Sequence, residues 1–265
     1  MNQPSCQFIT HLIKQAGQLI VQQRHQLQVQ FKGESASELV TQADLAADQL
    51  ITDTIRQHFP DHQILSEELA PDTTTDCPHL WVIDPIDGTV NYAHQQPQVA
   101  VSIAYFYRGV VETGAVYNPF SDELFIAQRG QGAQLNHQPI RCNDKTELHR
   151  ALVATGFPYV RKDLPMLMRR LNTVLEHCAD IRRCGSAALD ICWVACGRLD
   201  AYYESVKPWD FAAAQLIATE AGARFGHIYV PDGNSQLEGD NILCAGQTLF
   251  EPLRQLLIRA DQLSL

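Results

Sequence analysis

The chain has 265 residues, which is long enough to bury a large core as one or two compact domains. Its formal net charge of −10 argues against a general nucleic-acid binder, which usually presents a basic field. An acidic chain can still bind an anionic substrate if bound cations reverse the local charge. No apolar run approaches the roughly 18 residues of a membrane-spanning helix, and residues 1–17 lack the pattern of a secretory signal. We therefore expect a cytoplasmic protein with no membrane partner.

The first part of the chain predicts two helices followed by an antiparallel sheet. Apolar residues recur at helical spacing from Phe8 to Ile20. A second helix is expected over residues 44–59, because Thr41 can cap it with Asp44 three residues further on. Runs rich in β-branched and aromatic residues then predict strands over residues 63–66, 80–83, 99–107, 110–117 and 123–127.

After about residue 145 the pattern changes to an alternation of strands and helices, which indicates an α/β half. The expected strands cover residues 151–154, 201–203 and 242–245, and the expected helices cover 163–177, 185–196, 210–221 and the end of the chain from about 248. No linker rich in Pro or Gly separates the halves. We therefore expect an α+β lobe over residues 1–144, with most of the candidate metal ligands, and an α/β lobe over residues 145–265 that completes a shared cleft.

The segment WVIDPIDGT, residues 81–89, carries the strongest chemical signal. An apolar strand ends in two carboxylates three residues apart, Asp84 and Asp87. Pro85 forces the chain to turn, and Gly88 lets a ligand approach the backbone closely. Hard oxygen ligands beside exposed amides are what magnesium and phosphate require. A lone pair of aspartates at this spacing is typical of a solvated turn, whereas the complete string at a strand end is far more specific.

Two other acidic positions are weak signals when taken alone. Glu67 follows the expected strand 63–66, where an exposed loop would also place a glutamate. Asp210 lies in the string PWDF at the start of an apolar helix, where aspartate is favoured as an N-cap in any case.

Jointly, these sites resemble the inositol monophosphatase family. That family carries G-E-E, then W-[IV]-[IV]-D-P-[IL]-D-G-T, then W-D before an apolar helix, and the strings here are SEE, WVIDPIDGT and PWDFAAAQLIATEAG. The strings LVTQAD, ATGFP, GSAA and DAYYE extend the resemblance from about residue 32 to residue 222. It implies a layered αβαβα sandwich of the inositol monophosphatase and fructose-1,6-bisphosphatase type.

The resemblance also implies a role for each matching residue. Two or three Mg²⁺ ions would be bound by Glu67, Asp84, Asp87, Asp210 and the carbonyl group of Ile86. Glu67 and Thr89 would orient the attacking water, and Asp44 would hold the Thr89 hydroxyl group. The substrate would be bound by Asp87, Gly88, Thr89, Gly185, Ser186, Ala187 and Glu204. Lys32 would lie on a mobile loop near the metals.

The implied activity is that of a hydrolase, a magnesium-dependent phosphatase that is inhibited by lithium. Its reaction would convert myo-inositol monophosphate to inositol and phosphate by attack of a metal-activated water. Fructose-1,6-bisphosphate, histidinol phosphate and 3′-phosphonucleotides are alternative substrates. A non-catalytic interaction protein that keeps the fold is an alternative of another class.

The resemblance further implies a homodimer, and the sequence adds some departures from the family. Ser66 replaces the usual Gly, Val90 replaces a common Thr, and residues 226–239 depart from the usual T-G-G segment, which leaves substrate shape near that loop open. The basic pairs at residues 161–162, 169–170 and 182–183 are interpreted as solvated faces or subunit contacts.

Overall fold

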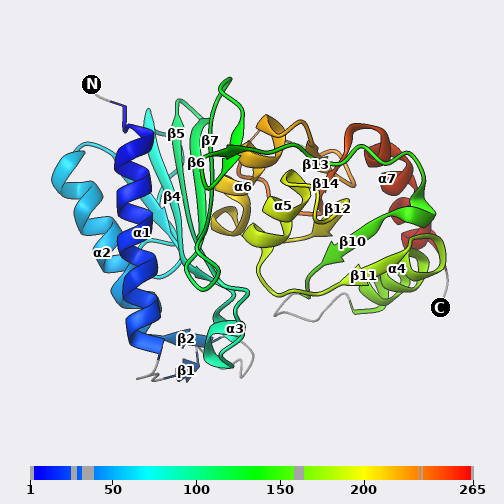
Figure 1. Cartoon of the computed structure of the whole chain (residues 1–265), viewed down its shortest axis with the longest axis horizontal. Helices are drawn as coiled ribbons and strands as arrows, with labels where there is room; N and C mark the ends of the chain where they lie inside the picture. Colours follow the sequence, from blue (N-terminus) through cyan, green and yellow to red (C-terminus); the bar gives the residue numbers. More distant parts are fainter. Residues whose placement is uncertain are drawn as a thin grey trace.

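The computed structural model describes residues 3–24, 29–31, 39–157, 164–231, 233 and 235–263. Helices and sheets alternate in five layers along its longest axis (Figure 1). The helices of the three helical layers, in the order of Figure 1 from left to right, are α1 (Cys6–Gln23) with α2 (Gln42–His58), α5 (Ala187–Ala195) with α6 (Pro208–Glu220), and α4 (Leu164–His177) with α7 (Gln247–Gln262). The predicted αβαβα sandwich is confirmed.

The first sheet has seven strands in the order β3-β4-β5-β6-β7-β8-β9. Their bounds are β3 (Gln63–Ser66), β4 (His79–Asp87), β5 (Ala100–Tyr107), β6 (Val110–Asn118), β7 (Glu123–Gln128), β8 (Ala133–Leu135) and β9 (Gln138–Pro139). All neighbours pair antiparallel except β3 and β4, which pair in parallel. The prediction of antiparallel pairing is therefore wrong for β3 alone, and it missed the short strands β8 and β9.

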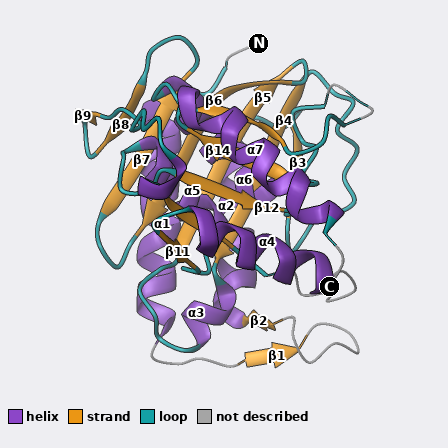
Figure 2. Cartoon of the chain, turned by 90° about the vertical axis from the view of Figure 1, so that its right-hand side faces the viewer, coloured by secondary structure: helices purple, strands orange, loops and turns teal. Residues whose placement is uncertain are grey.

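The second sheet has five strands in the order β11-β10-β12-β14-β13. Their bounds are β10 (Leu152–Thr155), β11 (Asp180–Arg182), β12 (Ala201–Glu204), β13 (Arg224–His227) and β14 (Ile242–Ala245). Strands β11, β10 and β12 are parallel, whereas β14 pairs antiparallel with both β12 and β13. Figure 2 views this half from the side, with α4 and α7 in front of the sheet.

Shorter elements lie at the edges of the layers. They are the paired strands β1 (Val29–Phe31) and β2 (Leu39–Thr41), helix α3 (Thr89–Ala93) and a 3₁₀ turn at Leu148–Arg150. Strands β1 and β2 and helix α3 lie together at the lower end of Figure 1. The predicted boundary at residues 144 and 145 falls between β9 and β10, and its status as a domain boundary stays a prediction.

Strand β4 lies inside the first sheet and is buried along its whole length. Its side chains alternate between two cores, as the period of a strand requires. Trp81 and Ile83 pack in the cluster formed with α1 and α2, and Leu80 and Val82 pack in the cluster formed with α5 and α6. In β6, Gly114 lets α6 approach closely, since a Cβ atom there would lie only 2.5 Å from the Ala213 carbonyl oxygen. These contacts bring the first turn of α6 to the end of β4.

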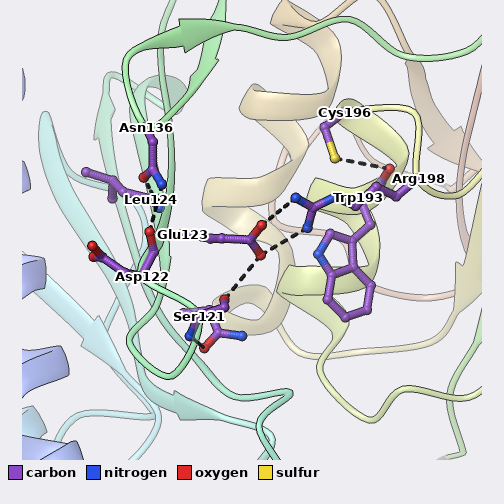
Figure 3. A network of polar contacts seen from close by, with 9 residues as sticks. Ser121, Asp122, Glu123, Leu124, Asn136, Trp193, Cys196 and Arg198 are labelled. Carbon is purple, nitrogen blue, oxygen red and sulfur yellow. Dashed lines mark hydrogen bonds and ion pairs between the residues drawn. The ribbon is translucent and has the colours of Figure 1, made fainter.

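Polar contacts also join the first sheet to the central helices (Figure 3). Arg198, just after α5, forms a two-pronged ion pair with Glu123 at the start of β7, and one of its hydrogen bonds measures 3.0 Å. Ser121 donates a hydrogen bond to the same carboxylate.

Among the described residues, no helix is both long and apolar enough to cross a membrane.

The interpretation of the basic pair 169–170 as a solvated face is wrong for Arg170. Only 4% of Arg170 is exposed, and its guanidinium donates to Asp261 at 2.8 and 2.7 Å and to Asn241 at 2.9 Å. Tyr229 donates a further hydrogen bond to Asp261. A buried arginine on the inner side of an amphipathic helix requires a partner distant in sequence, which the local pattern does not reveal.

We predict that Asp261→Ala lowers the free energy of unfolding by about 3–5 kcal/mol, because it leaves the Arg170 charge buried and unpaired. The matched control is Glu251→Ala in the same helix, which breaks the exposed pair with Arg254 and costs less than about 1 kcal/mol. Urea unfolding of the three proteins measures the difference. Equal losses in the two variants would contradict the account.

Candidate active site

Three carboxylates from two distant segments meet at one point. Asp84 and Asp87 come from the end of β4, and Asp210 comes from the first turn of α6; one oxygen of each lies within 4.8 Å of the others. In a regular strand, residues three apart point to opposite faces. The ladder between β4 and β5 shifts register between Asp84 and Asp87. This irregularity allows both side chains to face the same cluster.

The cluster carries more negative charge than its surroundings balance. Burial raises the pKa of Asp84 well above its usual value, and the negative charges of Glu67 and Asp87 raise it further. Burial also raises the pKa of Asp210, with Asp87 and Glu67 adding to the effect. Among the described residues, no lysine or arginine forms an ion pair with the three aspartates. Buried carboxylates that form no ion pair within the described part of the chain and offer only oxygen atoms fit a hard divalent cation.

Asp87 is held in place by the start of α5. Its carboxylate accepts hydrogen bonds from the Ser186 hydroxyl, the Ala187 amide at 3.3 Å and the Ala188 amide at 2.7 Å. Burial raises the pKa of Asp87 to about 6, and these donors oppose that rise. Ser186 also caps α5 by accepting from the Leu189 amide. Ser186 and Ala187 therefore position a carboxylate, and the substrate contact expected of them stays a prediction.

Asp210 lies in the third position of α6. The helix begins at Pro208, two residues earlier than predicted, so the interpretation of Asp210 as the N-cap is wrong. Lys207 is the N-cap, and its amide donates to Asp210 Oδ2 at 2.8 Å. This bond fixes one oxygen of the carboxylate at the helix start, where the helix dipole favours negative charge.

The turn after Asp87 brings Gly88 and Thr89 beside the cluster. Gly88 has φ of 100°, a conformation that favours glycine, and a Cβ atom there would lie 2.9 Å from the Gln98 carbonyl oxygen and 3.1 Å from that of Gly185. Thr89 Oγ1 lies 3.3 Å from Asp44 Oδ1 and 3.2 Å from the Ile86 carbonyl oxygen. The expected contact between Asp44 and Thr89 is thus present.

Asp44 is fixed by its own helix. Thr41 and Asp44 form the capping box of α2 as predicted, with the Thr41 amide 2.8 Å from Asp44 Oδ2. The carboxylate therefore has one oxygen committed to the cap and the other directed to Thr89.

Glu67 stands apart from the close cluster of the three aspartates. Glu67 follows β3 and donates its amide to the Ile83 carbonyl group at 3.2 Å, next to Asp84. It is not part of the close cluster, although its charge raises the pKa of Asp84 and of Asp210. Lys32 lies outside the described residues.

Glu204, which is expected to contact the substrate, lies at the end of β12. Burial raises its pKa to about 7, while the Tyr202 hydroxyl, which donates at 2.6 Å, and the charge of Arg183 oppose the rise. A Cβ atom at Gly156 would overlap the Glu204 carboxylate, so this glycine leaves room for it. The charge of Glu204 also raises the pKa of Asp210.

Sequence reasoning missed Tyr202 as a partner of Glu204. Side chains two residues apart in a strand lie on the same face, so the sequence spacing already indicated that Tyr202 and Glu204 are neighbours. It interpreted Arg183 only as part of a solvated face or subunit contact, although the charge of Arg183 also lowers the pKa of Asp87. For Gly156 no local signal existed, because its partner comes from another strand.

Comparison with known proteins decides the family. The model of the inositol monophosphatase family matches residues 1–258. The chain belongs to the inositol monophosphatase family.

Individual family members agree with this assignment. The protein named Nus factor SuhB of Pasteurella multocida is 40% identical over 241 residues, which cover 87% of this chain and 90% of that protein. The crystal structure of the extragenic suppressor protein SuhB from Bartonella henselae superposes with a TM-score of 0.86 at 33% identity, covering 94% of this chain and 96% of that one. The structure of inositol monophosphatase from Anabaena gives a TM-score of 0.83 at 36% identity, covering 94% and 93%.

The family members therefore carry two kinds of name, a phosphatase and a Nus factor. The first agrees with the acidic cluster. The second gives no support to the expectation, drawn from net charge, that argued against nucleic acid as a partner.

We predict that Asp84→Asn raises the melting temperature of the metal-free protein by a few degrees, because it removes one of several buried charges that repel one another. We also expect Mg²⁺ to raise the melting temperature of the wild type but not that of Asp84→Asn. Asp53→Asn, on the exposed side of α2, is the matched control. Melts in EDTA and in Mg²⁺ test both parts, and a lower melting temperature in EDTA would contradict the repulsion.

Proposed function

We propose that this protein is a magnesium-dependent phosphatase that hydrolyses a small phosphate monoester, with myo-inositol monophosphate as its substrate. The observation that carries the proposal is the cluster of Asp84, Asp87 and Asp210, three carboxylates within 4.8 Å of one another. The name of the Anabaena neighbour, inositol monophosphatase, supports the same substrate class.

In this proposal two or three Mg²⁺ ions are bound by the three aspartates together with Glu67 and the Ile86 carbonyl group. Bound magnesium supplies positive charge for the phosphoryl oxygens and lowers the pKa of a water. The chain's own part is to hold the ligands: the start of α5 holds Asp87, and Lys207 holds Asp210. No serine or cysteine nucleophile is required.

The phosphate and the water are placed by the turn after Asp87. The Gly88 and Thr89 amides hold the phosphate, while Glu67 and the Thr89 hydroxyl orient the water. Thr89 can hold a fixed orientation because its hydroxyl lies between Asp44 and the Ile86 carbonyl group.

Glu204 faces the hydroxylated part of the substrate, with Gly185, Ser186 and Ala187 along the same wall. A carboxylate accepts hydrogen bonds from ring hydroxyl groups. Fructose-1,6-bisphosphate, histidinol phosphate and 3′-phosphonucleotides are the competing substrates of the same chemistry. We also propose that the protein is cytoplasmic and forms a homodimer. Each chain would have two lobes, over residues 1–144 and 145–265.

A second candidate function is the binding of a macromolecular partner, which would not depend on catalysis. The name Nus factor, carried by the Pasteurella relative, favours it. The two functions are compatible, since the cluster occupies a small part of the chain.

Phosphate release from the four substrate classes tests the proposal. We expect inositol monophosphate to be hydrolysed fastest, EDTA to remove the activity, Mg²⁺ to restore it, and lithium to inhibit at high Mg²⁺. Asp210→Asn should lower kcat by on the order of a hundredfold or more, because it removes a metal ligand. Asp53→Asn, exposed on α2, should leave kcat unchanged.

Activity that survives exhaustive chelation, or full activity in Asp210→Asn, would contradict the metal assignment. No release from any of the four substrates by a folded protein in Mg²⁺ would favour the partner-binding function instead.

The role of Glu204 gives a prediction about specificity. Glu204→Ala should lower kcat/KM for inositol monophosphate by roughly ten- to a hundredfold, since a hydrogen bond to a charged group contributes about 1.5–3 kcal/mol. It should hardly change kcat/KM for a small phosphate ester without ring hydroxyl groups. Equal losses on both substrates would mean that Glu204 supports the metal cluster rather than the ring.

A further inference from the structure

Helix α2 carries two aspartates one turn apart on its buried face. Asp44 and Asp48 are both fully buried, among Ala47, Ile51 and Ile55. Asp44 contacts Thr89, as described above, but nothing so far explains Asp48. A carboxylate buried on an apolar helix face is costly unless it is hydrogen-bonded. Its hydrogen-bond partners therefore indicate its role.

Asp48 holds the turn that follows Glu67. Its Oδ2 atom accepts hydrogen bonds from the Glu68 amide at 3.2 Å and the Leu69 amide at 3.1 Å. The Glu67 amide itself donates to the Ile83 carbonyl oxygen at 3.2 Å. Three consecutive amides are thus anchored, one on β4 beside Asp84 and two on α2. The backbone of Glu67 is fixed between these anchors.

The other oxygen of Asp48 has no such bond. Asp48 Oδ1 and Ser66 Oγ are both buried, and neither has a hydrogen-bond partner among the described residues. The Ser66 hydroxyl group is still near enough to oppose the rise that burial causes in the pKa of Asp48. Asp48 thus makes its hydrogen bonds to the turn and forms no ion pair with a lysine or arginine of the described chain.

We propose that Asp48 is a positioning residue that sets the metal affinity of the site by fixing Glu67. The inference rests on the proposed function, in which Glu67 is a metal ligand. Helix α2 then holds two parts of the site at once, Thr89 through Asp44 and Glu67 through Asp48. Groups that orient metal ligands typically change metal affinity by about 10–100-fold when they are removed.

The experiment compares Asp48→Ala and Asp48→Asn with the wild type in the full-length protein. Thr52→Val is the matched control, because Thr52 lies one turn further along α2, is fully buried, and donates its hydroxyl group to the Gln49 carbonyl group of the same helix. Calorimetry measures the Kd for Mg²⁺, phosphate release measures activity, and hydrogen exchange measures the opening of residues 67–70.

We expect Asp48→Ala to raise the Kd for Mg²⁺ by about tenfold or more. Asp48→Asn keeps an oxygen acceptor but loses its charge, so we expect a rise of about fivefold. Hydrogen exchange of the Glu68 and Leu69 amides should be faster in both variants, and more so in Asp48→Ala than in Asp48→Asn. Thr52→Val should keep the wild-type Kd for Mg²⁺ and the wild-type exchange rates.

A purely structural role for Asp48 would lower the melting temperature and leave the Kd for Mg²⁺ unchanged, and that result would overturn the proposal. If Asp48→Ala does not fold, Asp48→Asn decides alone: unchanged Kd and unchanged exchange at residues 67–70 overturn it. Failure of the proposed function has a separate signature, since the wild type itself would then bind no Mg²⁺ and release no phosphate.

Discussion

The repulsion among buried carboxylates is the constraint on which the rest of this structure depends. One carboxylate oxygen each of Asp84, Asp87 and Asp210 lies within 4.8 Å of the others. Burial raises the pKa of all three, and neighbouring negative charges raise the pKa of Asp84 and of Asp210 further. Without other interactions, this repulsion would push the three carboxylates apart. Backbone donors hold all three in place. The Ile86 amide donates to Asp84, the amides of Ala187 and Ala188 donate to Asp87, and the Lys207 amide donates to Asp210. The fold therefore maintains an unfavourable arrangement that a divalent cation would relieve.

The layered architecture explains how these donors reach the cluster. Strand β4 supplies Asp84 and Asp87 from the first sheet, while helices α5 and α6 approach from the central layer (Figure 1). Gly114 permits the close approach of α6, and the ion pair between Arg198 and Glu123 joins the same two layers (Figure 3). On the opposite face of β4, α2 reaches the edge of the site through Asp44. A site shared among layers in this way gives each carboxylate a rigid support.

Much of the fold and of the candidate site could be predicted from the sequence. The αβαβα class followed from the family resemblance, and the capping box of α2 followed from Thr41 and Asp44. The acidic cluster followed from the resemblance of WVIDPIDGT and PWDF to the family's motifs, because Asp210 was a weak signal when taken alone. What could not be predicted depends on partners distant in sequence. Packing between layers determines three such features: the parallel pairing of β3, the burial of Arg170 against Asp261, and the hydrogen bond that Ser186 donates to Asp87.

Asp48 illustrates a signal that was present but not used. A second aspartate four residues after Asp44 falls on the buried face of the same helix, where a charge needs a partner. Net charge alone does not predict whether the protein binds nucleic acid, since the value of −10 says nothing about which surface a partner contacts.

The central claim is that the three aspartates bind a divalent cation. Crystals soaked in Mn²⁺, a hard cation that suits oxygen ligands, would test it most directly by anomalous scattering. The account predicts at least one strong anomalous peak within coordination distance of Asp84, Asp87 and Asp210, and its disappearance in Asp84→Asn. A well-ordered map with no peak at this cluster, or with peaks only elsewhere on the molecule, would contradict it.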